Sequence, residues 1–110
     1  MEQQNRLAAT VLETGAAGLG SAATLKLLEN QPEASAAFGN EAWSLWKTHF
    51  GDQALELAAA LRAGNPEMFQ TRVRWHRSAF AARQVPENWL RSALEAFREV
   101  IADELPPNAA

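Results

Sequence analysis

The sequence contains no cysteine and no tyrosine among its 110 residues. The lack of cysteine excludes disulfide bonds, thiolate zinc sites and cysteine nucleophiles. Valine and isoleucine are scarce, and no apolar–polar alternation stands beside a hairpin dipeptide, so β-strands are not expected. No apolar run approaches the roughly 18 residues that a membrane span needs, and the N-terminus lacks the basic region and apolar core of a secretory signal. These absences predict a soluble cytoplasmic protein that does not associate with a membrane.

Apolar residues make up 47% of the chain and charged residues 21%. This balance is typical of a globular protein and argues against intrinsic disorder. The net charge of -3 gives no electrostatic reason to expect nucleic-acid binding. A chain of this length suits one domain with one core.

Alanine and leucine dominate the composition, and both residues favour the α-helix. Glycine, proline and asparagine divide the chain into segments, and the short connections between the last three helices predict antiparallel neighbours. We therefore expect an all-α, single-domain bundle of four to five helices spanning residues 1–110. The expected helices are 3–17, 21–30, 40–63, 66–83 and 86–105, with a short helical piece over 32–39.

The boundaries of these segments rest on residues that end or begin helices. Three glycines within residues 15–20 each cost roughly 1 kcal/mol in a helix interior. They predict a break and a flexible hinge there, followed by Ser21 as the next N-cap. Asn40 is expected to cap the helix over 40–63. Gly64 is expected to end that helix, with Asn65 capping the next one. Residues 106–110 are expected to form a disordered tail.

Apolar residues recur at helical spacing in the last three segments, which predicts one buried face for each helix. In the segment 40–63 they are Trp43, Trp46, Phe50, Ala54, Leu57 and Leu61. In the segment 66–83 they are Phe69, Val73 and Phe80, and His76 lies on the same face. In the final segment they are Leu90, Leu94, Phe97, Ile101 and Leu105.

His76 lies on one of these apolar faces. We interpret it as a residue at the edge of the core that donates a ring proton to a carbonyl or carboxylate. The alternative is a pocket for a tetrapyrrole (cobalamin, haem or bilin), because a neutral imidazole can ligate its metal. The residues of that alternative pocket are Trp43, Trp46, Phe50, His76 and Phe80. We expect no metal site from His76 with His49, since the sequence has no glutamate–histidine metal motif.

The four tryptophans are numerous for a chain of this length, and tryptophan is enriched at interfaces. Trp75 lies off the apolar face of its segment, because successive helical residues differ by roughly 100°. Together with Arg77 and Trp89 it is our candidate for a face that binds a protein partner or a second copy.

Four arginines fall within residues 72–83, a clustering that can bind phosphate groups. The final segment supplies Glu87, Glu95, Glu99, Asp103 and Glu104. Ion pairing between the two segments is therefore the interpretation we favour. No phosphate-binding glycine loop, nucleophile elbow or metal motif occurs, so an enzyme is not expected.

Residues 55–101 resemble the helical caps that precede cobalamin-binding domains in bacterial regulators. The likeness rests on a leucine-rich helix that ends at Gly64-Asn65, and on the turn "QVPEN" before the last helix. In light-sensing members a tryptophan is followed by a glutamate–histidine pair. Here Trp46 and Glu56 give half of that pattern, and Leu57 stands in place of the histidine.

The turn "RQVPENW" is also similar to the turn that follows the proximal-ligand helix in bacterial sensor globins. The ligand histidine of that family would fall at Ala81, so this resemblance implies a haem-free module. Both resemblances imply a signalling role. We therefore expect a non-catalytic helical regulatory or sensory module without a cofactor. It would act through a protein partner or self-association, with tetrapyrrole binding as the alternative.

Overall fold

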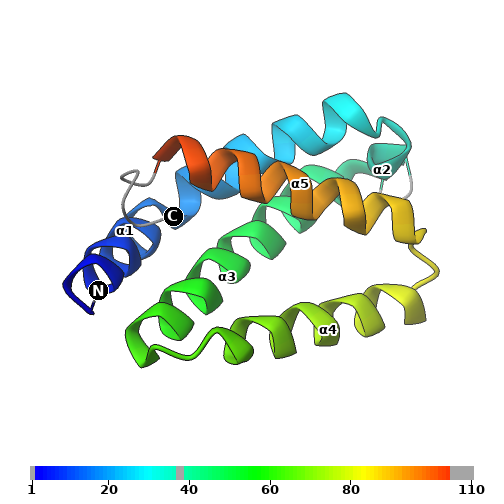
Figure 1. Ribbon diagram of the computed structural model, residues 1–110. Helices are drawn as coiled ribbons and strands as arrows, with labels where there is room; N and C mark the ends of the chain where they lie inside the picture. The colour runs from blue at the N-terminus through cyan, green and yellow to red at the C-terminus, as the bar shows by residue number, and fades with distance from the viewer. Residues whose placement is uncertain (1, 37–38, 105–110) are drawn as a thin grey trace.

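A computed structural model describes residues 2–36 and 39–104 and gives the chain an all-α fold (Figure 1). Its elements are α1 (Glu2–Asn30), α2 (Glu33–Ala36), the 3-10 turn η1 (Gly39–Glu41), α3 (Ala42–Ala63), α4 (Pro66–Ala82) and α5 (Glu87–Glu104). No strand occurs in these two ranges, so the predicted all-α bundle is confirmed. The predictions for Leu105 and for the tail 106–110 lie outside the described residues.

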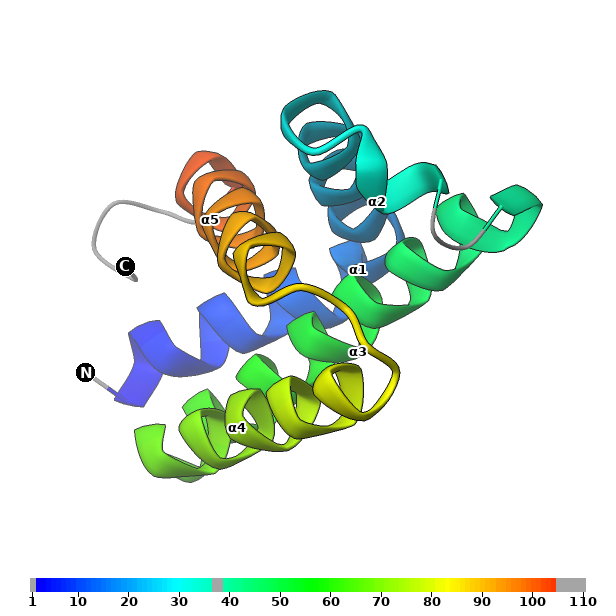
Figure 2. The ribbon, with the colours of Figure 1, turned by 90° about the vertical axis from the view of Figure 1, so that its right-hand side faces the viewer.

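Two long helices, α1 and α3, form the main contact of the bundle. Figure 2 shows α5 beside α1 and α4 beside α3, and the contacts agree with this arrangement. The α4 helix turns back along α3 through a two-residue connection, as the short punctuation predicts, but it contacts α5 very little. None of the helices in the described ranges has both the length and the apolar character needed to cross a bilayer.

The predicted break at residues 15–20 is wrong, because α1 runs through this stretch without interruption. Ser21 consequently lies inside a helix and caps nothing. The predicted flexibility of this stretch stays a prediction. A Cβ atom on Gly20 would lie 2.8 Å from the backbone oxygen of Lys47 in α3, far closer than Cβ atoms approach backbone. Glycine is therefore needed here for close helix contact, and packing against α3 outweighs its low helix propensity.

The α1 helix changes direction about halfway along its length (Figure 2). The side chain of Thr24 donates a hydrogen bond to the carbonyl oxygen of Gly20 at 2.7 Å. Such bonds to the preceding turn bend helices, and adjacent glycine and serine residues such as Gly20 and Ser21 allow it. The glycines thus produce a bend within one helix.

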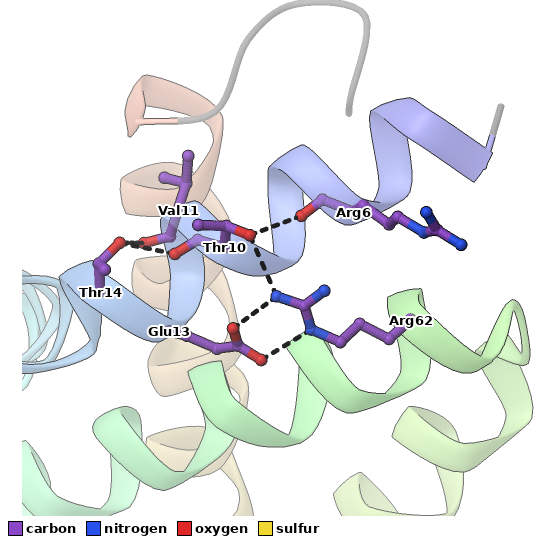
Figure 3. A network of polar contacts seen from close by, with 6 residues as sticks. All are labelled: Arg6, Thr10, Val11, Glu13, Thr14 and Arg62. Carbon is purple, nitrogen blue, oxygen red and sulfur yellow. Dashed lines mark hydrogen bonds and ion pairs between the residues drawn. The ribbon is translucent and has the colours of Figure 1, made fainter.

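A polar network joins the first half of α1 to the end of α3 (Figure 3). The guanidinium of Arg62 donates to both carboxylate oxygens of Glu13, at 2.6 and 2.9 Å, and to the hydroxyl of Thr10 at 3.1 Å. The hydrogen bonds from Arg62 lower the pKa of Glu13. The network connects the two helices. Because its side chains are exposed, it contributes little to the free energy of folding.

The boundary between α3 and α4 follows the prediction. Gly64 adopts a φ of 63°, the left-handed conformation that ends α3. The side chain of Asn65 accepts a hydrogen bond from the backbone of Glu67 at 3.1 Å and caps α4.

The predicted cap at Asn40 is wrong. This residue lies in η1, and α3 begins only at Ala42, where no side chain caps the helix. A 3-10 turn often precedes an α-helix and pairs its first backbone groups differently. Trp43 in the first turn of α3 is 43% exposed, so it does not belong to the core face on which it was expected.

Aromatic rings fill the centre of the bundle. Trp46 and Phe50 of α3 are completely buried. The ring of Phe97 in α5 stacks on Phe50 with centroids 6.3 Å apart, and on Phe69 of α4 at 6.2 Å. Phe97 thus links three helices through offset ring contacts.

Replacement of Gly20 by alanine is expected to lower the free energy of unfolding by about 1–3 kcal/mol, because the new methyl group overpacks the contact with α3. Gly18 is the matched control, since a Cβ atom there meets nothing within 4 Å. Gly18→Ala should raise stability by up to about 1 kcal/mol through helix propensity. Urea unfolding of the two variants measures both effects, and equal stabilisation by both would contradict the close contact at Gly20.

Candidate functional site

Polar side chains of α3 and α4 meet at the seam between these two helices. Glu56 lies two turns after His49 on α3, so both side chains share one face. One carboxylate oxygen of Glu56 lies 2.9 Å from Nε2 of His76 in α4. The other oxygen accepts a hydrogen bond from Arg72 at 2.8 Å. The Glu56 side chain is only 17% exposed, so the carboxylate is satisfied mainly by these two partners.

His76 lies at the edge of the core with its side chain 14% exposed. Because an ionised carboxylate only accepts hydrogen bonds, Nε2 of His76 donates to Glu56. This is the bonding expected for a structural histidine that donates to a carboxylate. The same nitrogen is therefore engaged and does not point into a free pocket.

His49 packs among aromatic rings. Its ring meets that of His76 edge to face with centroids 4.8 Å apart, and that of Phe80 in the same way at 5.0 Å. Burial, reinforced by the neighbouring His76, lowers the pKa of His49 to about 4. His49 is consequently neutral at pH 7. Within the two described ranges, no three His, Cys, Asp or Glu side chains are placed to hold a metal ion.

A cavity of about 90 Å³ lies where α3, α4 and α5 meet. Its polar lining consists of His49, Gln53, His76, Arg77, Glu87 and Arg91. Gln53 is 2% exposed, and its Oε1 atom is buried without a hydrogen-bond partner. A buried polar atom without a partner costs roughly 1–3 kcal/mol. A bound group that reaches this oxygen would gain a hydrogen bond that the protein itself does not supply.

A wider groove of about 330 Å³ runs along the other side of the histidine pair, between α3 and α4. Trp75 lies on its edge and is 55% exposed. The guanidinium carbon of Arg72 lies 4.6 Å from the centre of the Trp75 ring, a cation–π contact. His49 and His76 line both the groove and the cavity.

The five residues of the alternative tetrapyrrole pocket do not line one pocket. Trp46 and Phe50 are completely buried, and Phe80 stacks on Trp46 with centroids 5.3 Å apart. Trp43 points to solvent at the start of α3. The rings fill the space between one another. Of the five residues, only His76 lines the cavity, and only His76 and Phe80 line the groove.

The three candidate interface residues differ in exposure. Trp75 is 55% exposed and the Arg77 side chain 60% exposed, whereas Trp89 is half-buried against the core. Arg77 faces Glu87 at 3.7 Å, which is one of the ion pairs expected between α4 and α5. Arg72 does not form the expected ion pair with α5, because it pairs with Glu56 of α3.

Gln53 and Glu56 also belong to this site, although they were not among the residues predicted for it from the sequence. Together with His49 they form a polar row at spacings of 4 and 3, immediately beside the apolar face of α3. This helical spacing indicates that the three side chains share one face of α3. The contact of Glu56 with His76 depends on how α4 is aligned along α3. The spacing of residues within one helix does not predict that alignment.

Comparison with known protein families, curated proteins and solved structures finds no match to this chain. The resemblances to cobalamin-domain caps and sensor globins therefore stay predictions.

The lowered pKa of His49 predicts stability that depends on pH. Below its ordinary pKa of about 6.5, His49 takes up a proton in the unfolded chain but not in the folded one until about pH 4. The free energy of unfolding should therefore fall as the pH falls through this window, by about 2 kcal/mol between pH 7 and pH 5.

Urea unfolding of the wild type and of His49→Gln at both pH values measures this contribution. The variant keeps every carboxylate, so only the difference between the two proteins reports on His49. An equal loss of stability in both proteins would show that the native state does not suppress protonation of His49.

Proposed function

We propose that the chain is a cytoplasmic, non-catalytic helical module with a regulatory role, which acts by self-association through α4. The observation that carries this proposal is the exposure of Trp75. A tryptophan that is 55% exposed beside an apolar groove is the kind of residue that dominates the energy of protein interfaces. The two resemblances to signalling modules support the regulatory role.

The packing of α4 favours a partner for this helix. Of its 17 residues, only Phe80 is buried. Leu45, Ala79 and Phe80 contribute apolar surface to the groove next to Trp75. A second protein surface placed over this groove would remove the indole ring and these side chains from water, which is the main favourable term in association.

Charge complementarity indicates a second copy as that partner. Residues 66–83 carry four arginines and one glutamate, a net charge of +3. Residues 95–104 of α5 carry four acidic residues and one arginine, a net charge of -3, and these side chains are exposed. In a two-fold dimer, α4 of each copy would face α5 of the other, so both contacts would form together.

Light scattering across a concentration series tests the proposal. We expect the mass to rise toward that of a dimer, and Trp75→Ala to weaken the association roughly 30-fold, as loss of a hot-spot residue does. Trp43→Ala is the matched control, because Trp43 is an exposed tryptophan outside the groove. Added salt should weaken the dimer, since the proposed contact pairs opposite charges.

A protein that stays monomeric at about 1 mM would refute self-association, because its affinity would then be negligible. Dimerisation that is equally sensitive to Trp43→Ala and Trp75→Ala would refute α4 as the interface. Circular dichroism of each variant separates either outcome from loss of the fold.

A further inference from the structure

The cavity between α3, α4 and α5 is separate from the groove beside Trp75 on which the proposed dimer contact rests. Its volume of about 90 Å³ leaves room for water or for a small organic molecule. It lies on the opposite side of the histidine pair from the groove beside Trp75. A small molecule can therefore occupy it without touching the Trp75 face.

Gln53 indicates what such a molecule must offer. Its side chain lines the cavity and is 2% exposed, yet Oε1 has no hydrogen-bond donor within reach. The amide can turn about its terminal bond, because its oxygen and nitrogen ends have nearly the same shape. A ligand that brings one hydroxyl donor would satisfy the oxygen that the protein leaves without a partner.

The charged residues of the cavity favour an anion. Arg77 and Arg91 both line it, together with the single acid Glu87. Arg77 and Glu87 are 3.7 Å apart, and Arg91 makes no ion pair within residues 2–36 and 39–104. Two guanidinium groups against one carboxylate leave a positive balance, and guanidinium groups match a carboxylate in shape and hydrogen-bonding direction.

The remaining lining is apolar and consists of Val73, Leu90, Ala93 and Leu94. A compact inorganic anion would leave these side chains without a matching surface. A short carbon chain would cover them and keep the carboxylate and the hydroxyl apart. We therefore infer that this cavity binds a short-chain hydroxycarboxylate, with its carboxylate at Arg91 and Arg77 and its hydroxyl at Gln53.

Three probes of similar size test the inference, titrated into the full chain at constant ionic strength and followed by amide chemical shifts. Lactate carries both required groups, propionate lacks the hydroxyl, and lactamide lacks the charge. We expect lactate to shift the amides of Gln53 and of residues 90–94. Propionate and lactamide should each bind about tenfold more weakly, because each loses one interaction.

Variants assign the interactions to residues. Arg91→Gln should weaken lactate binding at least tenfold. Arg98→Gln is the matched control, because Arg98 is an exposed arginine on the same helix that does not line the cavity, and it should leave binding unchanged. Gln53→Met should remove the preference for lactate over propionate, because methionine has a similar size and offers no amide oxygen.

Absence of localised shifts at about 100 mM lactate would overturn the inference, since the cavity would then hold water only. Equal binding of lactate and propionate by the wild type would overturn the role of Gln53 and hence the ligand class. Equal effects of Arg91→Gln and Arg98→Gln would show nonspecific attraction to surface charge. If Gln53→Met does not fold, which its spectrum shows, the three probes and the two arginine variants still decide.

Discussion

The close contact of α1 with α3 at Gly20 is the constraint on which the rest of the molecule depends. A side chain as small as a methyl group would collide there with the backbone of α3. Both helices also contribute completely buried alanines to the core, among them Ala8 and Ala23 of α1 and Ala54 and Ala58 of α3. The large rings of α3 lie on other faces of that helix. Trp46 stacks on Phe80 of α4, and Phe50 stacks on Phe97 of α5.

The seam between α3 and α4 has a different chemistry from the contact between α1 and α3. Phe80 stacks on Trp46, while Glu56 binds His76 and Arg72. The α4 helix packs loosely against α5, and the cavity lies on one side of the seam. On its other side the groove beside Trp75 stays uncovered.

Much of the fold could be predicted because the residues concerned act locally. Gly64 and Asn65 end and begin helices through their own backbone and side chain, and the apolar spacing of α5 places Phe97 in the core. The errors arise where distant parts of the chain decide. The glycines of α1 predict a helix break, because the sequence does not show that Gly20 packs against the backbone of Lys47 in α3. The helical spacing of α4 predicts the face on which His76 lies. It does not predict that Glu56 is its partner, because that depends on how α4 is aligned along α3.

The histidine pair connects the two proposed surfaces, because its rings line both the cavity and the groove. His49 carries no charge at neutral pH, and His76 is fixed by Glu56, so the pair is a packed partition between the two sites. A ligand in the cavity can favour or oppose dimerisation only if it binds the free and associated forms with different affinity. Such a difference would require the two rings, which line both the cavity and the groove, to shift when the ligand binds. The coupling would be reciprocal, so dimerisation would change ligand affinity by the same factor.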